Sequence, residues 1–250
     1  MVNFLFKKSY QLKTFKPIVY DDLWGKKGIF TTIRVVGKKP NYILLSNHIK
    51  NMNSSLKTMN INFSLSQKKI CILIESLLNL KNPHNHLLRI AVNSKIISLS
   101  MRSRIQPNKN FSAVITSYQR TNPFLKNLYY KKIIKLLNSI NIEQQEIILS
   151  NRGLLLEGCT TNVLCVRDKK ICIPIKNYYR GVTMNYILRK TKRMIKKTYI
   201  PIKSLHEYEE ILLVGSGKGV VSLSSIPQIN WKSKSDLIYK ELLTSYTKLL

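Results

Sequence analysis

Acidic residues are scarce in this chain of 250 residues, which contains 12 Asp and Glu against 42 Lys and Arg and has a formal net charge of +30. Proteins that bind nucleic acids usually gather basic residues on one face or in a tail, with aromatic residues among them. Here Lys and Arg occur from end to end, and the densest run, 189–197, is predicted to be the solvent side of one helix. We therefore expect the charge to attract a small anionic substrate and predict no nucleic-acid partner, with a polyanion as the alternative.

The sequence also lacks a long hydrophobic run, because Lys, Asn or Ser interrupts every candidate for a membrane-spanning segment. No apolar stretch near the N-terminus suits a secretory signal, so we expect a cytoplasmic protein without a membrane segment. The 4 cysteines have neither Cys-x-x-Cys spacing nor a nearby histidine, which argues against a zinc ribbon or a redox pair. His84 and His86 lie in what we expect to be an exposed loop, and no metal site is predicted.

The N-terminal half combines strand-like and helical patterns, while residues 1–20 are basic, weakly periodic and expected to be peripheral. Alternating apolar residues predict strands, and apolar residues three or four positions apart predict helices. The strands cover 29–36, 42–45, 87–91, 96–101 and 113–118, and the helices cover 46–59 and 66–80. Strands, two helices and further strands indicate an α+β fold. Residues 118–123 resemble a connection, so we expect two domains, 1–118 and 119–250.

A helical pattern follows this connection, and Pro123 suits its first turn. Lys126 would then project at the positive N-terminal end of the helix, where burial and the helix field both disfavour the charged amine. A partly neutral lysine is a nucleophile for carbonyl compounds. The alternative is an ordinary surface lysine, with Lys131, Lys132 and Lys135 as rivals.

The stretch 154–162, LLLEGCTTN, lies between two short aliphatic runs and predicts a strand that ends in a loop of small residues. Glu157 lies where the strand gives way to the loop. A carboxylate at the edge of an apolar sheet is costly to bury unless a cation or a proton donor meets it. By itself, the position fits a solvated turn glutamate as well as a functional carboxylate.

Two glycine turns downstream suit the binding of a phosphate. Gly181-Val182-Thr183 opens a predicted helix that runs to about residue 196, so backbone N–H groups and the Thr183 hydroxyl would face an anion. Residues 215–219, GSGKG, follow a predicted strand, and their glycines allow a nest of N–H groups around a second phosphate edge. A plain tight turn is the alternative for this second stretch.

In this order and spacing, the lysine, the carboxylate and the two glycine turns resemble the fold-type IV (class IV) pyridoxal-phosphate-dependent aminotransferase family. The segments 28–35, GIFTTIRV, and 44–52, LLSNHIKNM, are similar to the small domain of that family. The resemblance implies a two-domain, D-amino-acid-transaminase-like α+β fold, with a small N-terminal domain and a larger C-terminal sheet and helix domain. It also implies a homodimer with pyridoxal 5'-phosphate as the cofactor.

The resemblance implies roles for single residues as well. Lys126 would carry the cofactor covalently and move protons at the substrate, and Glu157 would pair with the pyridine nitrogen. Arg34 and Thr32 are candidates for substrate binding, with Arg34 on a carboxylate. Tyr130 would support the cofactor ring. The cofactor phosphate would be held by Val182, Thr183, Ser216 and Gly217.

The sequence departs from the family at Asn51, where the family places a phosphate-binding arginine. Lys50 or Lys57 could supply the charge, but a lysine lacks the bidentate fork of an arginine, so we expect weaker cofactor binding.

Thr31-Thr32 and the loop 159–162 resemble the aminodeoxychorismate lyase branch of the family more than its aminotransferase branch. This implies a lyase of folate biosynthesis that converts 4-amino-4-deoxychorismate to 4-aminobenzoate and pyruvate. A branched-chain or D-amino-acid aminotransferase that uses the same residues is the second interpretation. The third is a cofactor-poor relative that acts as a binding protein, because of Asn51 and of Lys26-Lys27, where the family often has acidic residues.

Overall fold

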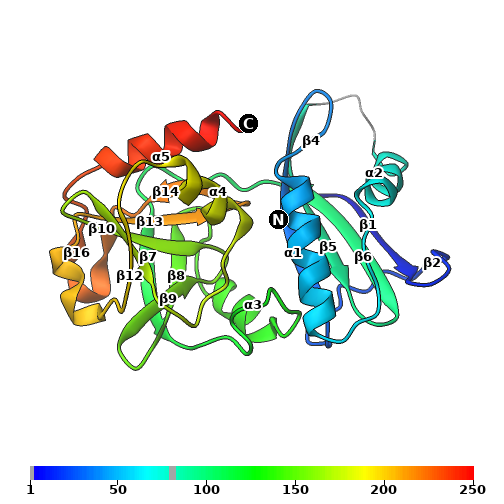
Figure 1. Cartoon of the computed structure of the whole chain (residues 1–250), viewed down its shortest axis with the longest axis horizontal. Helices are drawn as coiled ribbons and strands as arrows, with labels where there is room; N and C mark the ends of the chain where they lie inside the picture. Colours follow the sequence, from blue (N-terminus) through cyan, green and yellow to red (C-terminus); the bar gives the residue numbers. More distant parts are fainter. Residues whose placement is uncertain (1–2, 79–82) are drawn as a thin grey trace. The chain divides into compact units, whose positions relative to one another are not determined.

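The computed structural model describes residues 3–78 and 83–250, and the chain divides into two compact units (Figure 1). Unit 1 comprises Met1–Arg104 and Leu125–Lys131, and unit 2 comprises Ile105–Phe124 and Lys132–Leu250. These units differ from the expected division at 118/119, because strand β7 (Ser112–Ser117) pairs in parallel with β8 (Gln145–Asn151) of unit 2. Whether 1–118 and 119–250 fold as separate domains stays a prediction.

Unit 1 is built on a six-stranded sheet with the order β2-β1-β6-β5-β3-β4. All neighbours in this sheet are antiparallel. The strands are β1 (Phe4–Gln11), β2 (Pro17–Ile18), β3 (Ile29–Gly37), β4 (Asn41–Tyr42), β5 (His84–Val92) and β6 (Ile96–Ser103).

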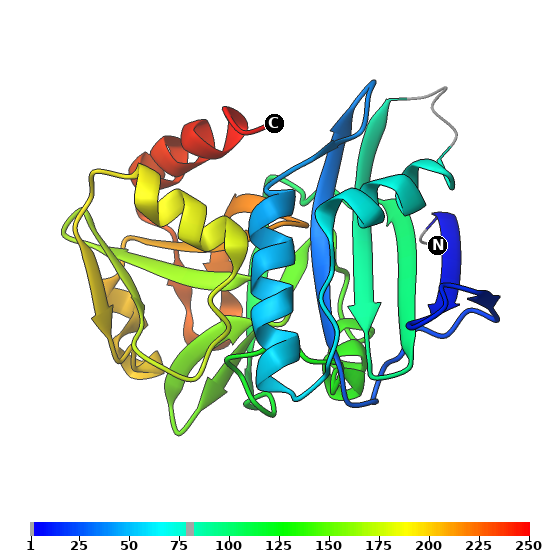
Figure 2. The same ribbon diagram turned by 45° about the vertical axis from the view of Figure 1, so that its right-hand side comes forward.

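Two helices, α1 (Leu45–Thr58) and α2 (Gln67–Glu75), cover one face of this sheet (Figure 2). Both helices follow the predicted apolar spacing, and Ser66 caps α2 by accepting a hydrogen bond from the Lys69 N–H. Side chains alternate along a strand, so Ile29, Ile33 and Val35 of β3 pack in the core under the helices. The residues that alternate with these three along β3 therefore point to the opposite face of the sheet.

Two expectations for unit 1 are wrong. The segment 4–11 is not peripheral, because it forms β1 and pairs with β6. His84 and His86 do not lie in a loop, since both belong to β5, and His84 is buried. In the described part of the chain, no group of His, Cys, Asp and Glu side chains is arranged to hold a metal ion.

Unit 2 contains two five-stranded sheets, with the orders β16-β15-β7-β8-β9 and β12-β11-β10-β13-β14. The first sheet adds β9 (Leu154–Gly158), β15 (Ser225–Ile226) and β16 (Trp231–Lys232) to β7 and β8. The second is formed by β10 (Asn162–Arg167), β11 (Lys170–Pro174), β12 (Ile195–Thr198), β13 (Glu210–Gly215) and β14 (Gly219–Ser222). Buried residues of both sheets, such as Ile148, Cys165 and Leu213, share one core cluster.

The helices of unit 2 cover the other face of the second sheet. Leu164 of β10 and Leu212 of β13 pack there against α4 (Val182–Lys190) and α5 (Leu237–Thr247). Strands β10 and β13 are thus buried on both faces, which explains why they consist of unbroken apolar runs. The remaining helices are α3 (Lys131–Leu137) and the short 3-10 helices η1 (Ile202–Glu207) and η2 (Pro227–Ile229).

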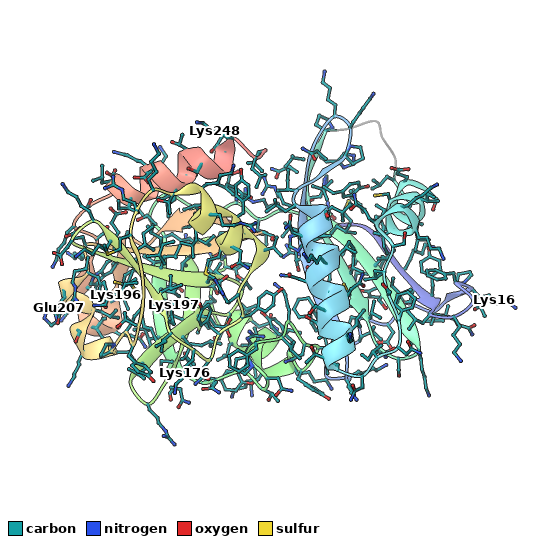
Figure 3. All side chains as sticks on the ribbon, viewed as in Figure 1. Lys16, Lys176, Lys196, Lys197, Glu207 and Lys248 are labelled. Carbon is teal, nitrogen blue, oxygen red and sulfur yellow. The ribbon has the colours of Figure 1, made fainter. Side chains whose placement is uncertain are left out.

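The basic run 189–197 does not lie on one helix, as was expected. Helix α4 ends at Lys190, and the chain then forms β12, which pairs in parallel with β11 at the edge of the sheet. Lys196 and Lys197 are exposed on this edge strand (Figure 3). The local spacing of apolar residues favoured a helix here, but the segment forms a strand because its backbone pairs with β11. In the described residues, no helix is long and apolar enough to cross a membrane.

Candidate active site

Lys126 lies in an extended segment of unit 1 rather than on a helix. Its carbonyl accepts a hydrogen bond from the Phe30 N–H at 2.9 Å, and the Leu128 N–H donates to the Gly28 carbonyl at 2.9 Å. A Cβ on Gly28 would lie 2.4 Å from the Val92 carbonyl oxygen, so a glycine permits this close approach. Because these backbone groups bond to β3, the helix α3 begins only at Lys131. The prediction that Lys126 lies at a helix N-terminus is wrong.

Aromatic rings surround the Lys126 amine, which is half-buried. Its Nζ lies 5.2 Å from the centroid of the Phe30 ring, within the range of a cation–π contact. Trp24 and Tyr130 pack edge-on to Phe30, with centroid distances of 4.8 and 5.1 Å. Tyr130 is buried. The three rings form one cluster, and the Lys126 amine lies over its Phe30 member.

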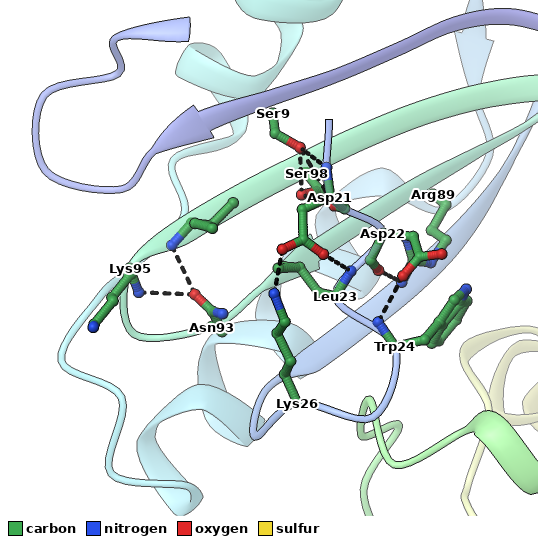
Figure 4. A network of polar contacts seen from close by, with 11 residues as sticks. Ser9, Asp21, Asp22, Leu23, Trp24, Lys26, Arg89, Asn93, Lys95 and Ser98 are labelled. Carbon is green, nitrogen blue, oxygen red and sulfur yellow. Dashed lines mark hydrogen bonds and ion pairs between the residues drawn. The ribbon is translucent and has the colours of Figure 1, made fainter. Parts of the chain in front are cut away.

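Arg89 adds a second cation to this aromatic cluster, and Figure 4 shows Arg89 near Asp22 and Trp24. Its guanidinium carbon lies 3.7 Å from the centroid of Trp24 and 5.4 Å from that of Phe30. Nη2 donates to the Asp22 carbonyl at 2.6 Å, whereas the buried Nε has no hydrogen-bond partner among the residues described. Burial lowers the pKa of Arg89 to about 10, so the side chain stays cationic at neutral pH.

Thr31 and Thr32 lie on opposite faces of the unit 1 sheet. Thr31 Oγ1 is 2.7 Å from Nδ1 of the buried His48 of α1. Burial, helped by the charge of Lys126, lowers the pKa of His48 to about 3, so its ring is neutral. By strand alternation, Thr32 and Arg34 share the other face with Phe30.

Arg34 is buried, and its Nε and Nη1 have no hydrogen-bond partner in the part of the chain described here. Leaving buried donors unsatisfied is unfavourable by about 1–3 kcal/mol for each group. The Nε and Nη1 donors point to different sides of the guanidinium, so one carboxylate would satisfy only one of them, and the substrate-binding role of Arg34 stays a prediction.

Glu157 lies in unit 2, where a buried arginine holds it. Arg120 Nε donates to Glu157 Oε1 at 2.8 Å and Arg120 Nη2 donates to Oε2 at 3.0 Å, and both side chains are 5% exposed. The Tyr179 N–H adds a hydrogen bond to Oε2 at 3.1 Å. β9 has one residue more than β8 between the pairs Leu149–Glu157 and Ser150–Leu155, a β-bulge that sets the direction of Glu157. A solvated turn glutamate, the alternative considered from sequence, does not describe this carboxylate.

A second buried carboxylate, Glu146 of β8, fixes the loop that follows Glu157. Its Oε2 accepts hydrogen bonds from Thr160 Oγ1 at 2.6 Å and from Thr161 Oγ1 at 3.4 Å. A Cβ on Gly158 would lie 2.2 Å from Thr161 Oγ1, so this tight loop requires glycine. Burial, with the charges of Glu146 and Glu157, raises the pKa of the Cys159 thiol, which makes Cys159 a poor nucleophile.

The two glycine turns meet at the start of α4. Asn162 Oδ1 accepts a hydrogen bond from the Gly181 N–H at 3.1 Å, and Asn162 Nδ2 donates to the Tyr179 carbonyl. Thr183 Oγ1 lies 3.1 Å from Ser216 Oγ in the β13–β14 turn, so the first turn of α4 and the GSGKG turn are neighbours. Backbone N–H groups of α4 and two hydroxyls together suit an anion with several oxygens.

Each unit gathers its own share of the expected site residues. In unit 1, Lys126 and Tyr130 contact the Phe30 ring, and Thr32 and Arg34 share its face of β3. In unit 2, a chain of hydrogen bonds runs from Glu157 through Tyr179 and Asn162 to Gly181, which precedes Val182 and Thr183, with Ser216 and Gly217 in the adjacent turn.

Sequence reasoning missed Arg89, Arg120 and Asn162. Arg89 lies opposite Thr32 on β5, so strand pairing could have placed it. Arg120 lies in an irregular connection, for which no periodicity gives a direction.

Comparisons with known proteins identify the class. The model of the family described as amino-transferase class IV matches residues 28–226. The chain therefore belongs to the class IV aminotransferase family, and the resemblance stated from its motifs is confirmed.

Individual relatives fall into both branches of this family. The chain is 23% identical to the aminodeoxychorismate lyase of Bacillus subtilis (strain 168), over 93% of this chain and 88% of the relative. It is 14% identical to the branched-chain amino acid aminotransferase of Thermobaculum terrenum in its PLP-form (holo-form), with a TM-score of 0.77 over 97% and 93% of the two chains. It is 16% identical to a candidate 4-amino-4-deoxychorismate lyase of Legionella pneumophila, with a TM-score of 0.73 over 89% and 91%. The solved structures confirm the predicted fold.

Proposed function

We propose that this chain is a pyridoxal-phosphate-dependent 4-amino-4-deoxychorismate lyase, which forms 4-aminobenzoate and pyruvate. The proposal depends chiefly on one observation: the face of the sheet that carries the Lys126 amine also carries two buried or half-buried arginines with unsatisfied donors, Arg34 and Arg89. The lyase substrate has one amine and two carboxylates, which match one lysine and two arginines. The similarity to the lyase of Bacillus subtilis also supports this reaction.

The residues present suit pyridoxal phosphate. The start of α4, with Val182 and Thr183, and the turn with Ser216 and Gly217 offer N–H groups and hydroxyls to a phosphate. Glu157 is a buried carboxylate whose charge is balanced by Arg120, which suits an acceptor for a pyridine N–H. When bound, this cofactor supplies an electron sink for negative charge at the amine-bearing carbon.

The chain's own residues have separate tasks in the proposed reaction. Lys126 would hold the cofactor and would accept the proton from the amine-bearing ring carbon of the substrate. The electron pair of that C–H bond then moves into the ring as the C–O bond to the enolpyruvyl group breaks. Enolpyruvate leaves and becomes pyruvate on protonation, and the ring becomes aromatic. Arg34 and Arg89 would bind the two carboxylates, Tyr130 would support the cofactor ring, and the Thr32 hydroxyl would bond the substrate.

An aminotransferase for branched-chain or D-amino acids is the second candidate. The observation in its favour is the TM-score of 0.77 to the branched-chain enzyme of Thermobaculum terrenum. For either reaction we propose a cytoplasmic homodimer that acts on a small anionic substrate.

The first experiment tests the cofactor and its lysine. Purified protein incubated with pyridoxal phosphate is expected to turn yellow, and borohydride is expected to fix the cofactor covalently to Lys126, as mapped by mass spectrometry. Lys126→Ala should lose the colour, whereas Lys132→Ala, on the exposed side of α3, should keep it. A cofactor that stays bound covalently in Lys126→Ala would refute the assignment.

The second experiment distinguishes the two reactions. Release of pyruvate from 4-amino-4-deoxychorismate without a keto acid is expected of the lyase. Strict dependence on 2-oxoglutarate, with amino-acid donors, would show a transaminase instead. Lys126→Ala is the control for either activity.

A further inference from the structure

A cavity of about 370 Å³ lies within unit 2, where the edge strand β9 of one sheet approaches β11 and β12 of the other. Pro201 forms a bridge with Leu154 of β9, and the Leu155 N–H donates to the Ile200 carbonyl at 2.9 Å, so one end of the crevice is closed by backbone pairing. A volume of this size is in the range of sites for small organic ligands.

The walls of this cavity combine apolar surface with positive charge. Leu154, Leu156 and Pro174 provide apolar surface, and the lining contains neither Asp nor Glu. Arg152 and Lys176 also line the cavity, and neither belongs to an ion pair among the described residues.

An aromatic side chain completes the rim. The Tyr199 ring is 50% exposed, and Lys176 Nζ lies 5.5 Å from its centroid. Figure 3 labels Lys176, together with Lys196 of β12, a lysine that does not line the cavity. An exposed aromatic side chain, two cations and several apolar side chains around one cavity are complementary to a flat ring that carries one carboxylate.

The same segments that line the cavity also hold Glu157. Gln119 lines the cavity and precedes Arg120, Leu156 lines it and precedes Glu157, and Asn177 lines it two residues before Tyr179. Arg120 and the Tyr179 N–H are the groups that bond Glu157. A ligand in the cavity would therefore touch all three backbone segments behind the Glu157 carboxylate.

We propose that this cavity is a second binding site, for a small aromatic carboxylate, on the far side of the segments that position Glu157. The site is built from unit 2 alone, so its existence does not depend on the reaction proposed above. Because the chain has a net charge of +30, cations occur at many places on its surface. Binding of a carboxylate in this cavity must therefore be distinguished from general electrostatic attraction to the protein.

Titration calorimetry with sodium benzoate on the purified full chain tests the proposal. We expect one benzoate per chain, and an affinity lowered at least about tenfold by Arg152→Gln and by Tyr199→Ala, as loss of a charge-assisted hydrogen bond or of a ring contact predicts. Both side chains are exposed, so the variants are expected to fold. Benzamide, which has the same shape without the charge, should bind at least about tenfold more weakly.

Two matched variants decide whether the site is specific. Lys196→Gln removes the same charge from β12 outside the cavity, and Arg34→Gln removes an arginine that is proposed to bind a substrate carboxylate; both should leave benzoate affinity unchanged. An equal loss in Arg152→Gln and Lys196→Gln would show general charge attraction and overturn the proposal. Loss of binding in Arg34→Gln would place benzoate at the substrate site and also overturn the proposal, whereas failure of the lyase assay alone would leave this result intact.

Discussion

Arg120 joins two segments of the candidate site through a buried ion pair. It neutralises Glu157 with two hydrogen bonds, binds the Pro123 carbonyl and is itself 5% exposed. A buried charge that loses its partner is strongly destabilising, because the protein then has to desolvate an uncompensated ion.

We predict that Arg120→Met lowers the free energy of unfolding by about 3–5 kcal/mol, since it leaves Glu157 charged and unpaired. Adding Glu157→Gln removes that charge, so the double variant should be less destabilised than the sum of the two single changes. Urea unfolding of the three variants at neutral pH measures this. Additive losses would show that the two side chains do not depend on each other.

His48 makes stability sensitive to acid. Its pKa is 6.5 in an ordinary environment and is lowered to about 3 by burial and by the charge of Lys126. The unfolded chain therefore binds more protons than the folded chain between these two pH values. The contribution of the neutral His48 to the free energy of unfolding is fully present above about pH 6.5. It is lost as the pH falls, by at most about 1.4 kcal/mol per pH unit. Urea unfolding between pH 7 and pH 4 should show a shallower slope in His48→Gln. His206→Gln, at an exposed histidine, is the control and should keep the wild-type slope.

Asn51 lies on α1 at the position where the family resemblance places an arginine for the phosphate. We predict that Asn51→Arg tightens the binding of pyridoxal phosphate by about 10–100-fold, because one hydrogen bond to a charged group contributes about 1.5–3 kcal/mol. Fluorescence titration of the apoprotein measures the affinity. Lys68→Arg, which adds a guanidinium at an exposed position of α2, should have little effect.

Among the secondary-structure elements, helix α5 has its N-terminus capped by a side chain of a strand. Asp236 precedes the helix but makes no side-chain capping bond, and Glu210 of β13 does this instead. Its carboxylate accepts hydrogen bonds from the N–H groups of Ile238 at 2.9 Å and Tyr239 at 2.7 Å. Glu210 is fully buried, so the first turn of α5 and the interior strand β13 depend on each other.

We predict that Glu210→Ala destabilises the protein by about 2–4 kcal/mol, because it leaves two buried N–H donors unsatisfied. Glu210→Gln keeps one acceptor oxygen and should lose less. Amide hydrogen exchange should show the loss of protection concentrated in 237–247 for the alanine variant. Loss of protection spread evenly over unit 2 would contradict a capping role.

For the protein as a whole, the charge of +30 is a cost to the folded state. Compact folding brings like charges together, and salt screens them over a Debye length that falls from about 30 Å at 0.01 M to about 8 Å at 0.15 M. We predict that the thermal unfolding midpoint rises with sodium chloride over this range. Sucrose at matched osmolality is the control for solvent effects. An unchanged midpoint in salt would mean that self-repulsion is unimportant.

Local patterns in the sequence were enough to place most regular elements and to indicate the family. Most strands and helices follow from apolar periodicity, since one face of each is buried, and the glycine turns and LLLEGCTTN carried the resemblance. The order of Lys126, Glu157, Thr183 and Ser216 along the chain was enough to predict pyridoxal-phosphate chemistry, which the experiments above test.

The partners of several of these residues are visible only in the folded chain. Lys126 lies beside β3 because its backbone is bonded to that strand, and 195–198 forms an edge strand because β11 offers free backbone groups. Arg120 meets Glu157 across 37 residues of sequence. No local pattern encodes such partners, because a hydrogen bond between distant segments depends on where the whole chain places them.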